Sequence, residues 1–83
     1  MRDDIIVQVE NLGYFYEGGS SDGVLIFSQK ANSIINGIFL NIDLDRREYS
    51  KIRHRYWPTG SSHVRLDPTP EEKKVLDNII RNY

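Results

Sequence analysis

The most informative absence in this sequence is cysteine, of which the 83 residues contain none. A chain without cysteine forms no disulfide, holds no Cys-ligated zinc or iron–sulfur cluster, and has no thiol nucleophile. Small secreted domains of this length commonly depend on disulfides, so the absence favours a reducing environment. We therefore expect an intracellular, cytoplasmic protein.

Long apolar runs are also missing. The longest continuous ones have only a few residues, such as 24–27 and 38–40, and fall far short of the roughly 20 residues that a membrane-spanning helix needs. The N-terminal stretch MRDDIIVQVE places two aspartates where a signal peptide would need an apolar segment. The sequence therefore predicts no signal peptide and no membrane partner.

Motifs for catalysis or metal binding are absent as well. His54 and His63 are the only histidines, and no carboxylate pattern of a metal site accompanies them. The stretch GYFYEGGS matches a phosphate-binding loop except that Gly19 replaces the essential lysine, so we reject that function. No serine lies in a nucleophile elbow. We expect no metal, no cofactor and no enzymatic activity.

Charge is nearly balanced overall but unevenly distributed. The net charge is −1, yet residues 1–45 carry −5, residues 46–66 carry +5 and residues 67–83 carry −1. A basic segment inside an acidic chain suits an anionic partner, and it also suits a homodimer in which opposite blocks meet. The overall balance argues against indiscriminate coating of nucleic acid.

Hydrophobic periodicity predicts an α+β fold in a single domain, residues 1–83. Residues 4–10, 24–28, 38–44 and 50–57 alternate or form short apolar runs, and we expect strands within residues 4–66. The strands should form a small antiparallel sheet of four or five members, strongly curled.

A C-terminal helix over about residues 70–82 is the clearest element. Thr69 is placed as N-cap, Pro70 at the first helical position and Glu72 at the capping-box position. We expect this helix to pack on the apolar face of the sheet. Apolar side chains recur at helical spacing at Val75, Leu76, Ile79, Ile80 and Tyr83.

Residues 29–37 admit three structures. Asn36-Gly37 between apolar pairs favours a two-residue hairpin turn, which we prefer. The same glycine could instead cap a short helix that begins at Ser28. In the third alternative the turn lies at residues 30–33 and Gly37 forms a bulge.

The register of the next two strands follows from matching side chains across them. Setting Ile42 against Ile52 also sets Asp43 against Lys51, so apolar meets apolar and opposite charges meet. This register directs Ile52 and Tyr56 toward the core.

The following turn is expected to have an odd number of residues, three or five, with Gly60 in a left-handed conformation. Only an odd loop places Val64 and Leu66 on the same face as Ile52. His54 and His63 then point to opposite faces.

Together these registers predict one outward row of cationic and aromatic side chains on the strand SKIRHRYW. The expected partner-binding residues are Lys51, Arg53, Arg55 and Trp57, with Arg65 across from Arg55, His63 across from Trp57, and Phe39 alongside. Arginines and aromatics on a sheet can grip single-stranded nucleic acid, and the same residue types dominate protein hot spots. A solvated strand face with charges that guard against aggregation explains the pattern equally well.

We expect a small non-catalytic regulator, inhibitor or adaptor that binds an acidic protein surface, a type common on phages and other mobile elements. The alternative is a module that binds single-stranded RNA or DNA through the same surface. A third, minor hypothesis places a small-ligand pocket beside residues 17–23, lined by Tyr14 and Tyr16.

Overall fold

The computed structural model describes residues 2–19, 23–29 and 36–83. In chain order the elements are α1 (Arg2–Glu10), β1 (Tyr14–Gly19), β2 (Val24–Gln29), β3 (Asn36–Asp43), β4 (Glu48–Trp57), β5 (Gly60–Leu66) and α2 (Pro70–Asn82). The strands form one antiparallel five-stranded sheet in the order β1-β2-β3-β4-β5. The predicted α+β fold with a C-terminal helix is confirmed.

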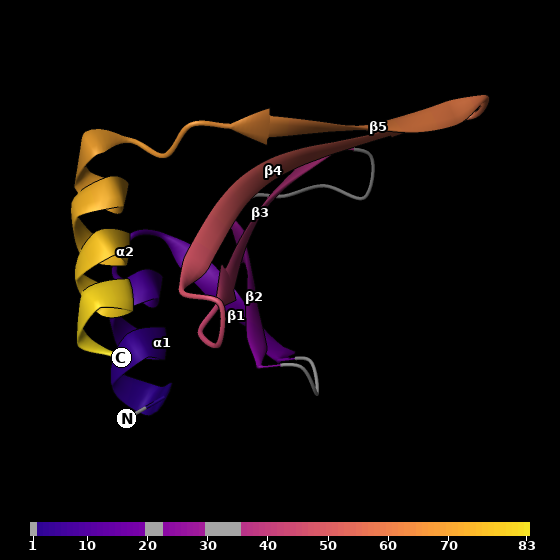
Figure 1. The fold of residues 1–83 in the computed structure, drawn as a ribbon. Coiled ribbons are helices and arrows are strands. Elements are labelled where there is room, and N and C mark those ends of the chain that lie inside the picture. The colour runs from indigo at the N-terminus through magenta and orange to yellow at the C-terminus, as the bar shows by residue number, and fades with distance from the viewer. Residues whose placement is uncertain (1, 20–22, 30–35) are drawn as a thin grey trace.

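Both helices lie on the same face of the open, curled sheet, which we call the helix face, and the opposite one is the outer face (Figure 1). The core lies between the helices and the helix face, because strand residues alternate between the two faces. Its fully buried side chains are Val9, Tyr14, Leu25, Phe27, Leu40, Ile42, Leu44 and Leu76.

The N-terminal segment is a helix, so the strand predicted at residues 4–10 is wrong. Ile5 and Val9, one helical turn apart, are buried, whereas Val7 is 53% exposed. The strand prediction rested on an alternating pattern around Val7 and Val9. Burial of the i, i+4 pair overrides that weak local signal. Gly13, with a φ of 101°, then turns the chain into β1.

The favoured hairpin turn at Asn36-Gly37 is also wrong. Both residues belong to β3, where they pair with Arg55 and His54. The register continues without a shift at Gly37, so no bulge forms there, and Ser28 lies in β2 rather than starting a helix. The connection from β2 to β3 falls at residues 30–35, outside the described residues.

The β3–β4 register differs from the predicted one by three residues. Leu40 pairs with Lys51, and Phe39 pairs with Ile52. An odd shift exchanges the two faces of a strand. Lys51 therefore points to the helix face and Ile52 to the outer face, opposite to the prediction. The connection begins after Asp43, with a positive φ of 56° at Arg47.

The β4–β5 loop has two residues rather than three or five. Trp57 pairs with Gly60, and Gly60 does not have a positive φ. The even loop sets Arg65 across from Ile52 instead of Arg55, so the two guanidinium groups are not opposed. Like charges that face each other across strands repel, which favours the observed pairing.

A buried ion pair explains why β4 presents Lys51 to the helix face. Lys51 is only 8% exposed, and its Nζ donates to Glu72 Oε1 at 2.9 Å. The Tyr14 hydroxyl donates to Glu72 Oε2 at 2.7 Å, and the backbone amide of Thr69 donates to Oε1 at 2.9 Å. The predicted capping box of α2 thus also holds the ammonium group of β4 and the phenol of β1.

The surroundings of Glu72 keep it ionised. Burial alone would raise the pKa of its carboxyl, but the hydrogen bonds from Lys51, Thr69 and Tyr14 outweigh burial and hold that pKa below its ordinary value. Burial and the adjacent carboxylate raise the pKa of the Tyr14 phenol. The cluster is therefore charge-balanced, with each buried polar group bonded.

Replacing Lys51 tests this cluster. Lys51→Met leaves a buried carboxylate without its cation, and we expect the free energy of unfolding to fall by about 3–5 kcal/mol. Urea denaturation followed by circular dichroism measures it. Lys73→Met, an exposed lysine of α2, is the control and should change stability by less than about 0.5 kcal/mol. The double variant Lys51→Met/Glu72→Gln should recover part of the loss, and a Lys51→Met protein as stable as the control would contradict the account.

Acid should remove the contribution of Glu72. Because its folded pKa lies below the ordinary value of 4.5, the carboxylate stabilises the fold above about pH 4.5 and loses that effect as the pH falls through the folded pKa. We expect the stability difference between the wild type and Glu72→Gln to shrink below about pH 4.5. Urea titrations from pH 7 to pH 3 measure this difference. A difference that stays constant with pH would show that Glu72 titrates normally.

Candidate functional site

The hairpin of β4 and β5 is largely exposed beyond the base of the sheet, and we call residues 52–65 the β4–β5 arm. Within the described residues, β3 accompanies β4 only as far as Arg55. Figure 1 shows the tip of the hairpin extending away from both helices. The arm is therefore a two-stranded projection whose base belongs to the sheet and whose tip lies outside the core.

Large apolar side chains lie exposed on both faces of the arm. Tyr56 is 47% exposed on the outer face, and Trp57 (48%) and Val64 (50%) lie on the helix face beyond the helices. The indole of Trp57 lies across Gly60, where an added Cβ would be 3.5 Å from Nε1. A two-stranded hairpin has no interior of its own in which to bury such groups. They remain available to a partner.

The arm also carries cations that no described residue neutralises. Residues 49–66 contain no carboxylate. Among the described residues, none forms an ion pair with Arg53, Arg55 or Arg65; the ion pairs found there join Arg46 to Asp43 and Lys51 to Glu72. The charge of the arm is therefore open to an anionic partner.

The predicted site residues do not form one row. Lys51 is buried and paired with Glu72. This position conflicts with the expectation that Lys51 contacts a partner. The others divide between the faces: Arg53, Arg55 and Trp57 lie on the helix face, whereas Phe39, His63 and Arg65 lie on the outer face. The physical reason is the pair of odd register shifts described above.

The sequence analysis missed an aromatic cluster on the outer face. His54 and His63 are cross-strand partners, and their rings stack with centroids 3.9 Å apart, so the prediction that they diverge is wrong. Phe39 and Tyr56 contact the His54 ring edge-on, and His54 Nδ1 lies 3.0 Å from the Tyr56 hydroxyl. Burial, and then the neighbouring His63, lower the pKa of His54. A two-residue loop at Pro58 and Thr59, had it been considered, would have set His54 opposite His63.

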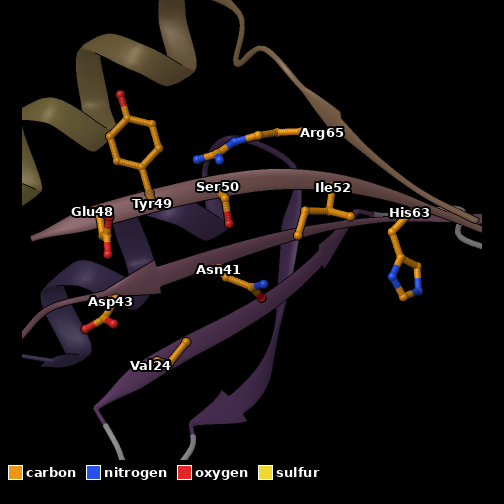
Figure 2. Close-up of a pocket in the computed structure, with 9 residues that line it drawn as sticks. All are labelled: Val24, Asn41, Asp43, Glu48, Tyr49, Ser50, Ile52, His63 and Arg65. Carbon is orange, nitrogen blue, oxygen red and sulfur yellow. The ribbon is translucent and has the colours of Figure 1, made fainter. Parts of the chain in front are cut away.

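A groove of about 460 Å³ on the outer face adjoins this cluster. Figure 2 shows the carboxylates of Asp43 and Glu48 together at one end and the His63 imidazole at the other. Between them lies Ser50, and the Arg65 side chain extends from β5 toward it. The groove therefore carries carboxylates as well as a guanidinium group, which suits a partner with both signs of charge better than a continuous polyanion.

Tyr49 also borders the groove but serves the fold. Its hydroxyl donates to Asp77 Oδ1 of α2 at 2.6 Å. Burial and this carboxylate raise the pKa of the phenol to about 12, so Tyr49 stays protonated and is no acid–base group near neutral pH.

One of the two residues proposed to line a small-ligand pocket is inaccessible. Tyr14 is buried and its hydroxyl is bonded to Glu72, so it is not accessible to a ligand. The ring of Tyr16 packs against that of Phe27, with the two ring centroids 5.3 Å apart. Residues 20–22 of the adjoining loop lie outside the described part of the chain.

Two further observations concern sites of other kinds. Within residues 2–19, 23–29 and 36–83, no group of three or more histidine and carboxylate side chains is placed to hold a metal ion. In the same residues neither helix has the length and apolar character to cross a membrane.

No family model matches the chain, and comparison with the curated proteins and with the solved structures found no match.

Proposed function

We propose that this protein is a small non-catalytic binding protein, a regulator, inhibitor or adaptor, that docks on an acidic protein surface through the β4–β5 arm. The observation that carries the proposal is the combination of half-exposed Trp57 and Tyr56 with arginines that have no ion-pair partner among the described residues. Trp, Tyr and Arg are the residue types that contribute most at protein interfaces.

The shape of the arm favours a protein partner. Apolar side chains on both faces are buried together only when the arm enters a cleft or lies between two surfaces. The neighbouring carboxylates Asp43 and Glu48 would repel a phosphate chain that continued across the outer face. A protein surface can place acidic groups at the arginines and avoid these carboxylates.

The base of the arm is fixed, which reduces the entropy lost on binding. β4 runs continuously from the sheet into the arm, and Lys51 joins it to Glu72 of α2. A preorganised element loses less conformational freedom when it binds.

Trp57→Ala tests the proposal. We expect the variant to lose about 2 kcal/mol of affinity, roughly thirtyfold, because a central aromatic anchor is removed. The readout is the recovery of one stoichiometric protein from native lysate treated with nuclease, followed by titration with that protein. Tyr83→Ala is the matched control, since Tyr83 is 50% exposed at the C-terminus of α2. Retention of the partner by Trp57→Ala at the level of the control would refute the proposal.

Single-stranded nucleic acid is the second candidate. It is favoured by Arg55 and Trp57, which are two residues apart on the helix face of β4, because bases stack on aromatic rings while arginines contact phosphates. Trp57 is the only tryptophan, so its fluorescence reports binding directly. This candidate predicts quenching by oligonucleotides of about 12 nucleotides at low salt, with affinity that falls steeply as salt rises. Unchanged Trp57 emission with both DNA and RNA would eliminate it.

A further inference from the structure

The last strand of the sheet has an open edge. β5 pairs with β4 over its whole length without a register shift, from Trp57–Gly60 to Lys51–Leu66, and no other described strand adjoins it. Sheet edges are usually protected by charged side chains, lysine above all, by proline or by a bulge. The seven residues Gly60–Leu66 contain no lysine, no proline and no bulge, and their one charged side chain is Arg65. By contrast, the opposite edge strand β1 has a bulge between Tyr16 and Gly18.

The free backbone groups of β5 can be assigned from the loop. In a two-residue hairpin loop the flanking residues, Trp57 and Gly60, bond to each other, and the ladder then alternates along the strand. The N–H and C=O groups of Ser61, His63 and Arg65 consequently point to the open edge. They provide three successive positions for pairing with an added strand.

The side chains of β5 indicate which kind of strand would fit beside its open edge. On the outer face β5 presents His63 and Arg65, both exposed, with no carboxylate among residues 49–66. On the helix face it presents Val64, 50% exposed, followed by Leu66. A strand beside β5 would meet these side chains on alternate residues.

From this pattern we infer that the β5 edge binds an extended acidic segment of the partner protein as a sixth strand. Carboxylates of that segment lie on the outer face opposite His63 and Arg65, and its apolar side chains lie on the helix face beside Val64. This inference rests on the proposed function and specifies how the arm engages its partner. Trp57 and Arg55 at the tip extend the contact beyond the added strand.

A second copy of this chain fits the edge less well. Pairing β5 with β5 would bring the His63 and Arg65 side chains of both copies onto one face, and like charges across strands destabilise a pair. Charge complementarity therefore selects an acidic strand.

A nine-residue peptide in which glutamate and valine alternate tests the inference. Fluorescence anisotropy of the labelled peptide should show binding to the wild-type protein and at least about tenfold weaker binding to Arg65→Glu. A peptide with lysine in place of glutamate should reverse that preference. Arg81→Glu, an equal charge change at an exposed site on α2, is the control and should bind as the wild type does.

Two further peptides separate strand addition from attraction of charge alone. A peptide of the same composition with its glutamates in one block should bind at least about tenfold more weakly, since it cannot present one face of each kind. N-methylation of all the valine amides or of all the glutamate amides blocks one edge of the peptide, so one methylated form should lose binding and the other keep it. Equal binding by the block peptide, or by both methylated forms, would overturn the inference.

The remaining outcomes are also decisive. If the alternating peptide does not bind while a captured partner still depends on Trp57, strand addition is wrong and the proposed function stands. If capture does not depend on Trp57, the proposed function itself fails. A dimer of the protein alone in sedimentation velocity, displaced by the alternating peptide, would assign the edge to a second copy and overturn the choice of an acidic strand.

Discussion

The buried ion pair between Lys51 and Glu72 is the interaction on which the rest of the structure depends. It joins the middle of β4 to the first turn of α2, and Tyr14 and Thr69 complete the bonding of the carboxylate. A buried ion pair need not exceed an apolar contact in stability, because both groups lose their hydration. Its effect here is to fix the register of β4 in the sheet. If β4 slipped by one residue, Lys51 would turn to the outer face and Glu72 would remain buried without a cation.

The orientation of Lys51 determines the surface of the arm. Side chains two and four residues further along β4, Arg53 and Arg55, share its face, but they lie beyond the part that the helices cover. The same strand therefore contributes one cation to the core, leaves Arg53 partly exposed and leaves Arg55 exposed. Trp57 follows them on that face, while His54 and Tyr56 take the other. The arm thus has two faces of different composition rather than one basic row.

Much of the fold could be predicted from local sequence signals. The capping box at Thr69 and Glu72 correctly predicted α2, and the alternation in residues 38–44 and 50–57 correctly predicted two long strands. The basic character of the middle segment is also a property of the sequence. These features depend on residues close together in the chain, where physical rules are strongest.

The candidate site could not be predicted as reliably, because it depends on register and tertiary partners. Charge matching of Asp43 with Lys51 gave a plausible pairing, but the true partner of Lys51 lies 21 residues away on α2. Shifts of three residues in the pairing of β4 with β3 and with β5 then reversed the faces of β4 relative to both neighbours. The helix at the N-terminus was missed for a related reason, since Ile5 and Val9 become a helical stripe only once the sheet and α2 exist to bury it.

Nuclear Overhauser contacts in the isotopically labelled protein test the central claim most directly, because they report which side chains of β4 and β5 lie side by side on the same face. The account predicts contacts between the imidazole protons of His54 and His63, and between the Lys51 side chain and the Tyr14 ring. Contacts from His63 to the Trp57 indole, together with Lys51 beside Asp43, would contradict it.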